Sequence, residues 1–214
     1  MTAPHTEHVR GALRRDDEGR EFWEVTGVEA LPPFLVSLVS ASDVWAYIST
    51  SGGLTAGRID SSRVLFPYET DDRLHHASGL TGPLTLLRVG GQLWQPFDPR
   101  GLAPGRERLL RKSAEGHWLE LEERAPDLGL TFRQRWTTSP RFGLVRRCTL
   151  EGDADEVEIL DGLLNLMPAD VPARAQEGLS ALVDAYKRSE LLPGGAALFA
   201  MDALLSDQAD PAEA

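Results

Sequence analysis

Residues 130–137 read Leu130-Thr131-Phe132-Arg133-Gln134-Arg135-Trp136-Thr137, a stretch in which apolar and polar side chains largely alternate. The even-numbered side chains are largely apolar, whereas the odd-numbered ones are all polar. A period of two is typical of a β-strand with one face on a core and the other in water. The stretch therefore predicts an antiparallel strand, and Trp136 is expected in the core.

Similar segments recur on both sides of this stretch. Between residues 100 and 165 the expected strands are 108–112, 117–123, 128–137, 142–150 and 156–160, with turn residues between them. Earlier short apolar runs predict strands at 34–40, 44–50, 54–59, 64–68, 84–89 and 93–97. This rhythm is that of an antiparallel meander, so the sequence predicts a mainly β fold, an antiparallel β-sandwich of two sheets.

The regions that flank the strands have different patterns, so three segments are expected. Residues 1–30 begin with a polar stretch and are predicted to be a mobile N-terminal lead-in, followed by the sandwich over residues 31–168. Residues 169–214 are predicted to be a helical linker and the start of a following region that this chain lacks. Pro172 suits the first turn of that helix, because the N–H it lacks is not needed there.

The predicted linker helix is amphipathic. Apolar residues recur at i, i+3, i+4 and i+7, the spacing of one stripe on a helix, and they are Leu179, Leu182, Val183 and Tyr186. We expect this stripe to be an interface with whatever follows the sandwich.

Charge is distributed unevenly along the 214 residues, whose formal net charge is −11. The chain holds 19 basic and 19 acidic residues up to Thr149, but 3 basic and 14 acidic residues from Leu150 onward. An acidic chain without a basic stripe is a poor candidate for binding nucleic acid or an anionic membrane. With no apolar run long enough for a secretory signal or a membrane span, a cytoplasmic protein is expected.

Motifs for catalysis are incomplete. The lone Cys148 supports neither a disulfide framework nor a thiolate metal site. The glycine spacing of 52–57 matches a phosphate-binding loop, but Arg58 and Ile59 stand where that loop needs Lys and Ser or Thr, so a hairpin is the better interpretation. We predict no catalytic residue, no cofactor and no metal.

Two groups of side chains have the chemistry of a functional site. Asp71, Asp72, His75 and His76 offer metal-ligand chemistry, but a solvated loop between two strands explains them equally well. Glu120 and Glu122 share the strand face opposite Leu119, which is the pattern of a solvated face rather than of the paired carboxylates of a glycosidase.

The chain is rich in tryptophan, with five in all. Indole faces stack on sugar rings, so exposed tryptophans would make a carbohydrate platform. Trp94 and Trp118 are the candidates for such exposure.

Several segments together resemble the amino-terminal region of large bacterial proteins related to cellobiose phosphorylase. These segments are GGLTAGR at 52–58, LFPYETDD at 65–72, GP at 82–83, LWQPF at 93–97, RWTTS at 135–139, GLVRR at 143–147, LDGL at 160–163 and DAYKRSE at 184–190. The resemblance covers roughly residues 34–214. It implies a sandwich of the super-sandwich type, joined by a helical linker to a large (α/α)6 barrel that holds the catalytic acid.

The resemblance implies a role without catalysis for this chain, because no position here matches a catalytic residue of that family. The sandwich would pack on the barrel and lend the loops 52–58 and 68–76 to a sugar site. Arg58, Asp71 and Asp72 would then bind sugar hydroxyls or brace the interface. The expected partners are an oligosaccharide or the catalytic barrel. Two alternatives remain open: a free-standing carbohydrate-binding or protein-interaction module, and a metal enzyme that uses the loop around Asp71.

Overall fold

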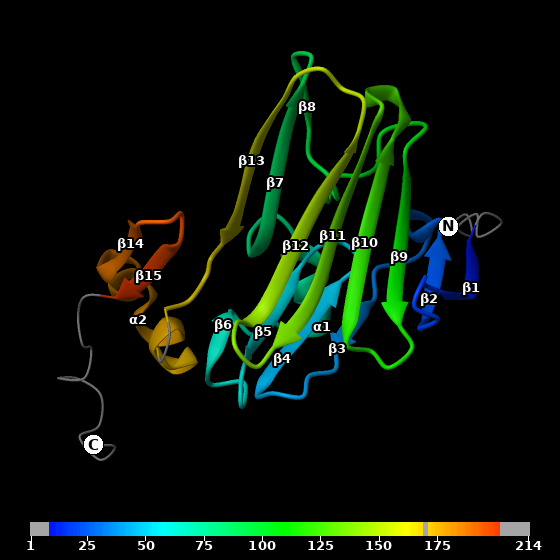
Figure 1. Ribbon diagram of the computed structural model, residues 1–214. Coiled ribbons are helices and arrows are strands. Elements are labelled where there is room, and N and C mark those ends of the chain that lie inside the picture. Colours follow the sequence, from blue (N-terminus) through cyan, green and yellow to red (C-terminus); the bar gives the residue numbers. More distant parts are fainter. Residues whose placement is uncertain (1–8, 169–170, 202–214) are drawn as a thin grey trace, which may run out of the picture.

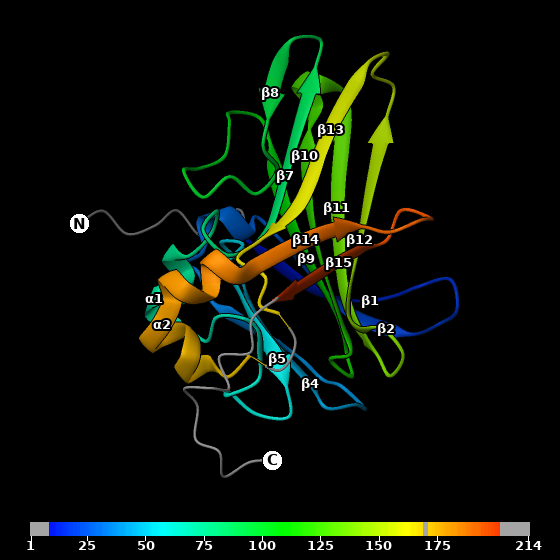
Figure 2. The ribbon, with the colours of Figure 1, turned by 90° about the vertical axis from the view of Figure 1, so that its left-hand side faces the viewer.

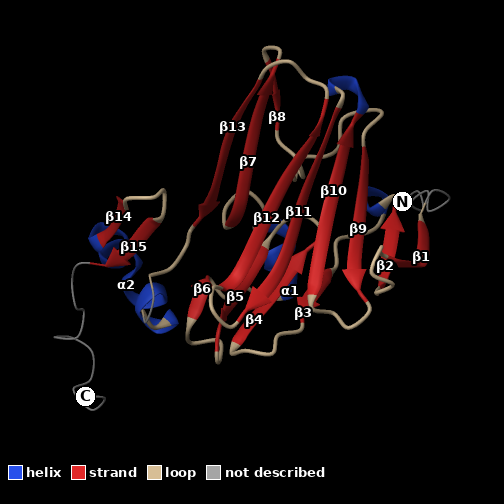
Figure 3. Cartoon of the chain, in the orientation of Figure 1, coloured by secondary structure: helices blue, strands red, loops and turns tan. Residues whose placement is uncertain are grey.

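The chain folds as a mainly β protein, as the sequence predicts. The computed structural model describes residues 9–168 and 171–201, and every strand pair in this part of the chain is antiparallel (Figure 3). Each strand expected from the apolar runs is present, with ends displaced by a few residues at most.

One layer of the sandwich is a six-stranded sheet in the order β1-β2-β9-β10-β11-β12 (Figure 1). Its strands are β1 (Arg10–Arg15), β2 (Glu21–Thr26), β9 (Glu107–Ser113), β10 (Trp118–Ala125), β11 (Leu130–Ser139) and β12 (Gly143–Gly152). β11 contains the alternating stretch, and it pairs with β10 on one side and β12 on the other.

The other layer is divided between two smaller sheets, with orders β3-β4-β5-β6 and β13-β7-β8. The first contains β3 (Leu35–Leu38), β4 (Val44–Ser49), β5 (Leu54–Arg58) and β6 (Val64–Phe66). The second contains β7 (Gly82–Val89), β8 (Gln92–Trp94) and β13 (Val157–Leu164). The short helices are η2 (Val28–Ala30), α1 (Asp71–His76) and η3 (Pro126–Leu128).

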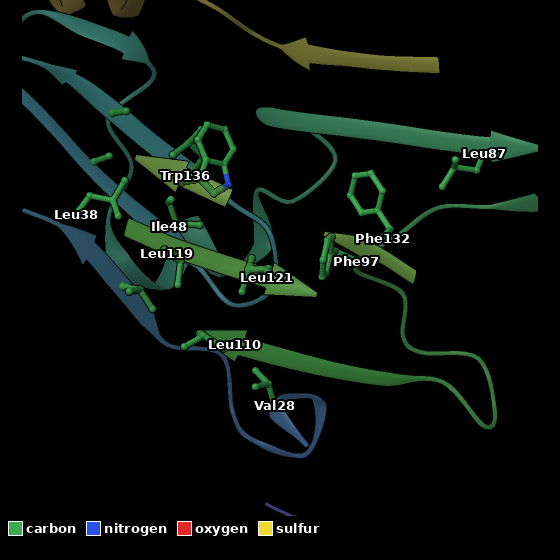
Figure 4. Close-up of a cluster of buried hydrophobic side chains, with 14 of the residues drawn as sticks. Val28, Leu38, Ile48, Leu87, Phe97, Leu110, Leu119, Leu121, Phe132 and Trp136 are labelled. Carbon is green, nitrogen blue, oxygen red and sulfur yellow. The ribbon is translucent and has the colours of Figure 1, made fainter. Parts of the chain in front are cut away.

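The main hydrophobic core draws on all three sheets (Figure 4). Phe132 and Trp136 of β11 are buried, which confirms the inward face predicted from the alternation, and they lie in one cluster with Ile48 of β4 and Leu87 of β7. Burial of aromatic and branched side chains from facing sheets is the main contribution to the stability of such a sandwich.

The sequence predicts a mobile lead-in over residues 1–30, but Arg10 to Thr26 form two strands instead. There β1 and β2 form a hairpin, and β2 pairs with β9 at the edge of the six-stranded sheet. The sequence pattern misses these strands because their residues are mostly exposed or half-buried, so their alternation is weak. Backbone pairing with β9, nearly ninety positions away, is what holds them.

After the sandwich the chain forms α2 (Ala173–Tyr186) and a hairpin of β14 (Lys187–Leu191) and β15 (Ala197–Met201). These elements lie beside the sandwich in Figure 1 and in front of it in Figure 2. None of the described helices has the length and apolar character needed to span a bilayer.

The predicted apolar stripe of the linker helix does not form one buried face. The backbone of Leu179 is non-helical, with φ −134° and ψ 31°, so α2 is kinked there. Val183 is buried against Val64 and Met167, whereas Leu182 and Tyr186 are exposed. The predicted interface residues therefore point to more than one surface.

Candidate functional site

A cleft of about 520 Å³ lies along two strands that belong to different sheets, β12 and β13. β12 ends the six-stranded sheet and β13 ends the three-stranded sheet, and the two strands do not pair with each other. They are visible side by side in Figures 1 and 2. The volume is in the range typical of small-molecule sites.

An arginine–aspartate pair bridges the two strands inside the cleft. Arg146 Nη1 of β12 donates to both carboxylate oxygens of Asp161 of β13, at 2.9 and 2.8 Å. Arg146 also donates from Nη2 to Thr85 Oγ1 at 2.8 Å and from Nε to Gln134 Oε1 at 3.1 Å. Asp161 lies within β13 and fixes the position of this guanidinium.

Trp136 lines the cleft beneath this pair. Its ring centroid is 5.8 Å from the Arg146 guanidinium carbon, and the residue is 2% exposed. Nε1 of Trp136 is buried and has no hydrogen-bond partner in the described part of the chain. A buried N–H without an acceptor is costly and uncommon in folded proteins.

The rim of the cleft is cationic and aromatic. Arg141 and Phe142 lie in the turn between β11 and β12, with the guanidinium carbon 5.0 Å from the ring centroid, and Phe142 is 69% exposed. Arg58, the last residue of β5, also lines the cleft, and it donates from Nε and Nη2 to Asp43 at 3.0 and 2.8 Å. These bonds from Arg58 lower the pKa of the Asp43 carboxyl.

Beside the cleft, β13 exposes apolar side chains on both of its faces. Ile159 and Leu160 are successive residues, so they point to opposite faces, yet both are exposed, Leu160 by 64%. Leu163 is exposed as well, and it lines a second groove of about 530 Å³ together with Leu198 of β15. We use the name β13 face for the exposed apolar residues of both sides of this strand and its neighbour β15, Ile159, Leu160, Leu163 and Leu198. Exposed large apolar side chains gathered in this way mark interaction sites.

The structure places Trp94 in the core, so its prediction as a sugar platform is wrong. The residue is 1% exposed, and its Nε1 donates to Glu123 Oε1 at 2.9 Å. The guanidinium carbon of Arg106 lies 5.4 Å from the ring centroid. The strand predicted around Trp94 is present as β8. The sequence does not show, however, that the sheet packs this side chain inward.

Trp118 is half-buried and lies outside the cleft. The Arg135 guanidinium carbon is 4.4 Å from its ring centroid, and the Phe22 ring is 5.8 Å away. It borders a separate hollow of about 240 Å³ with His117 and Arg147. The ring is therefore partly covered, and the two predicted tryptophans do not come together.

Asp71 and Asp72 are exposed on α1, which replaces the predicted loop, and neither lines the cleft. Asp72 Oδ1 accepts a bond of 2.6 Å from Thr70, which lowers the pKa of that carboxyl. His75 Nε2 lies 3.2 Å from Asp71, and His75 Nδ1 is 2.8 Å from Ser49 Oγ. Among the residues that the structure describes, no three His, Cys, Asp or Glu side chains are grouped to hold a metal ion.

Glu120 and Glu122 are buried, contrary to the solvated face that the sequence predicts. Arginines cover them: Arg111 Nη1 donates to both, at 3.0 Å to Glu120 and 2.6 Å to Glu122. Arg124 and Arg133 also donate to Glu122. Burial raises the pKa of Glu122, but these donors outweigh it and hold the pKa at about 2.

Of the predicted substrate-binding residues, Arg58 alone lines the cleft. The other chemistry-bearing groups there, Trp136, Arg141, Arg146 and Asp161, were not predicted as site residues. A signal for one of them was present, because Asp161 interrupts the apolar run of residues 159–164. Its partner Arg146 is on another sheet, which the sequence does not reveal.

No protein-family model matches the chain, and no curated protein matches it either. The likeness to the cellobiose phosphorylase group therefore remains a prediction from the quoted segments.

Proposed function

We propose that this chain is the non-catalytic β-sandwich of a carbohydrate-active protein of the glycoside phosphorylase or hydrolase kind. It docks on a catalytic (α/α)6 barrel through the β13 face and lends the neighbouring cleft to a sugar site. The observation that supports the proposal is the exposure of β13 on both faces, because a sandwich strand with Ile159, Leu160 and Leu163 in water is stabilised when another domain covers it.

The chemistry of the cleft supports a role without catalysis. Glycoside hydrolysis uses two carboxyl groups that face each other roughly 5 to 10 Å apart across the sugar. Among the described residues that line the cleft, Asp161 is the only carboxylate, and both of its oxygens accept bonds from Arg146. A carboxylate held in this way positions a guanidinium instead of transferring a proton.

The second candidate is a free-standing ligand-binding module. The cleft favours this second candidate, because residues of this chain form the hollow of about 520 Å³ without a partner domain. Trp136 and Phe142 are in its lining. In this case Ile159 and Leu160 would play no part in binding.

Affinity purification of the tagged full chain from the cells that naturally express it tests the first candidate. We expect a protein with a glycoside-active (α/α)6 barrel to co-purify, and Leu160→Glu to abolish its recovery. Leu93→Glu is the matched control, because Leu93 is 72% exposed on the other edge strand of the same sheet. Recovery of no barrel protein, or equal recovery with both variants, contradicts the proposal.

A further inference from the structure

We propose that the cleft between β12 and β13 binds a sugar-sized ligand that carries an oxyanion, a carboxylate or a phosphate. The anion lies at Arg141 on the rim, and a ligand oxygen accepts the N–H of Trp136. This inference does not depend on a barrel partner, so it applies to the isolated chain and its failure is separate from that of the proposed function.

The charge of the lining favours an anionic ligand. Three arginines and one aspartate line the cleft, which makes its lining cationic within a protein of net charge −11. The Asp161 carboxylate is matched to Arg146, so Arg58 and Arg141 are the other two cations of the lining. Arg58 has a carboxylate partner in Asp43, whereas Arg141 makes no ion pair within the described ranges. A planar guanidinium at the rim suits bidentate binding of a carboxylate or phosphate.

The unpartnered donor of Trp136 favours a ligand that carries an acceptor oxygen. Trp136 lines the cleft, and its buried Nε1 lacks an acceptor among the described residues. Asp161, the carboxylate among the described residues of the lining, already accepts bonds from Arg146 and Thr85. An acceptor oxygen on a ligand would satisfy this N–H, and it would tie the ligand to the cleft at a second point.

The apolar walls of the cleft favour a ring-shaped ligand. Phe142 exposes its ring at the rim, and Leu144 and Leu163 contribute apolar walls. A free inorganic anion would use the cations but leave these surfaces in water. A ring-shaped body between the walls buries them while its anionic substituent reaches Arg141, so an acidic sugar or a sugar phosphate fits better than either a bare anion or a neutral sugar.

Isothermal titration calorimetry on the full chain tests the class of ligand. The probes are glucuronate, glucose 6-phosphate, glucose and inorganic phosphate, each at low ionic strength. We expect one or both of the anionic sugars to bind about tenfold more tightly than glucose and than inorganic phosphate, and the affinity to fall as salt is added. The comparison of glucuronate with glucose 6-phosphate identifies the anion. Equal binding of glucose, or binding of no anionic sugar, overturns the proposal.

Variants locate the site. Arg141→Gln removes the rim charge and is expected to weaken binding about tenfold. Arg147→Gln is the matched control, because Arg147 lies on the opposite face of β12 and borders the hollow near Trp118 instead. Equal loss in both variants contradicts the location.

The donor is tested separately with Trp136→Phe, which keeps an aromatic ring and removes the N–H. We expect weaker binding of the anionic sugar, with thermal unfolding measured alongside. If this core variant does not fold, the comparison of Arg141→Gln with Arg147→Gln decides the matter. Leu160→Glu on the β13 face is expected to bind the ligand as the unmodified chain does.

Discussion

At the residue scale, the Glu122 carboxylate joins strands of the six-stranded sheet through its arginine partners. It is buried on β10, and Arg111 of β9 and Arg133 of β11 donate to it at 2.6 and 2.5 Å. We expect Glu122→Gln to lower the free energy of unfolding by about 3 kcal/mol, because the guanidinium groups lose their counter-charge. Urea denaturation at pH 7 measures this loss, with the exposed pair member Glu158→Gln as a control that should change little.

The same carboxylate gives a pH dependence. The pKa of Glu122 is about 2 in the folded protein, below its ordinary value of 4.5. The ionised group therefore stabilises the fold fully above the unfolded pKa, and this contribution is lost as the pH falls from about 4.5 toward 2. The difference in unfolding free energy between the unmodified chain and Glu122→Gln should shrink across that window. A difference that stays constant down to pH 2 would show that the charge is not the cause.

Trp94 makes a second prediction at this scale. Trp94→Phe retains most of the apolar volume but removes the donor to Glu123 Oε1, so we expect a loss of about 1 to 3 kcal/mol in unfolding free energy. Trp23→Phe, at a half-exposed position on β2, should change stability by less than about 0.5 kcal/mol. Thermal and urea unfolding measure both. An unchanged midpoint for Trp94→Phe would mean that the buried bond contributes little.

At the element scale, β13 is held to the rest of the sandwich by few side-chain bonds. It pairs with β7 through the backbone, and Arg146 with Asp161 joins it to β12. We expect Asp161→Asn to lower stability by about 1 kcal/mol and to speed amide hydrogen exchange in β13 and β12 more than in β10. Exchange followed by mass spectrometry measures this, and a uniform change over all strands would contradict a local role.

The helices and strands also show which local sequence patterns predict secondary structure. Runs of alternating or continuous apolar residues predicted β3 to β13, and each of β3 to β11 buries part of one face. β12 and β13 contain no buried residue, so their prediction depends on apolar content alone. β1 and β2 lack such a face, and α1 spans only six residues, too few for a helical period. Their structure depends on partners far away in the sequence, as in the pairing of β2 with β9.

At the scale of the whole molecule, the apolar β13 face is the feature that a single chain leaves uncovered. We expect Leu160→Glu to change the unfolding free energy of the isolated chain by less than about 0.5 kcal/mol, because the side chain is mostly in water already. Binding of the dye ANS should decrease, since a large exposed apolar side chain is removed. Leu93→Glu should affect the dye less, and a strong destabilisation by Leu160→Glu would mean that this face is packed.

The sequence by itself determined that the chain is an antiparallel β-sandwich, since a period of two in 130–137 and its neighbours dictates which side of each strand is apolar. It also placed Trp136 in the core, which the structure confirms. The tertiary structure alone decided that Trp94 is buried, that arginines cover Glu122, and that Arg146 meets Asp161 beside the cleft. The physical reason is that periodicity assigns a side chain to a face of its own strand, whereas its partner across the layers depends on how separate sheets pack.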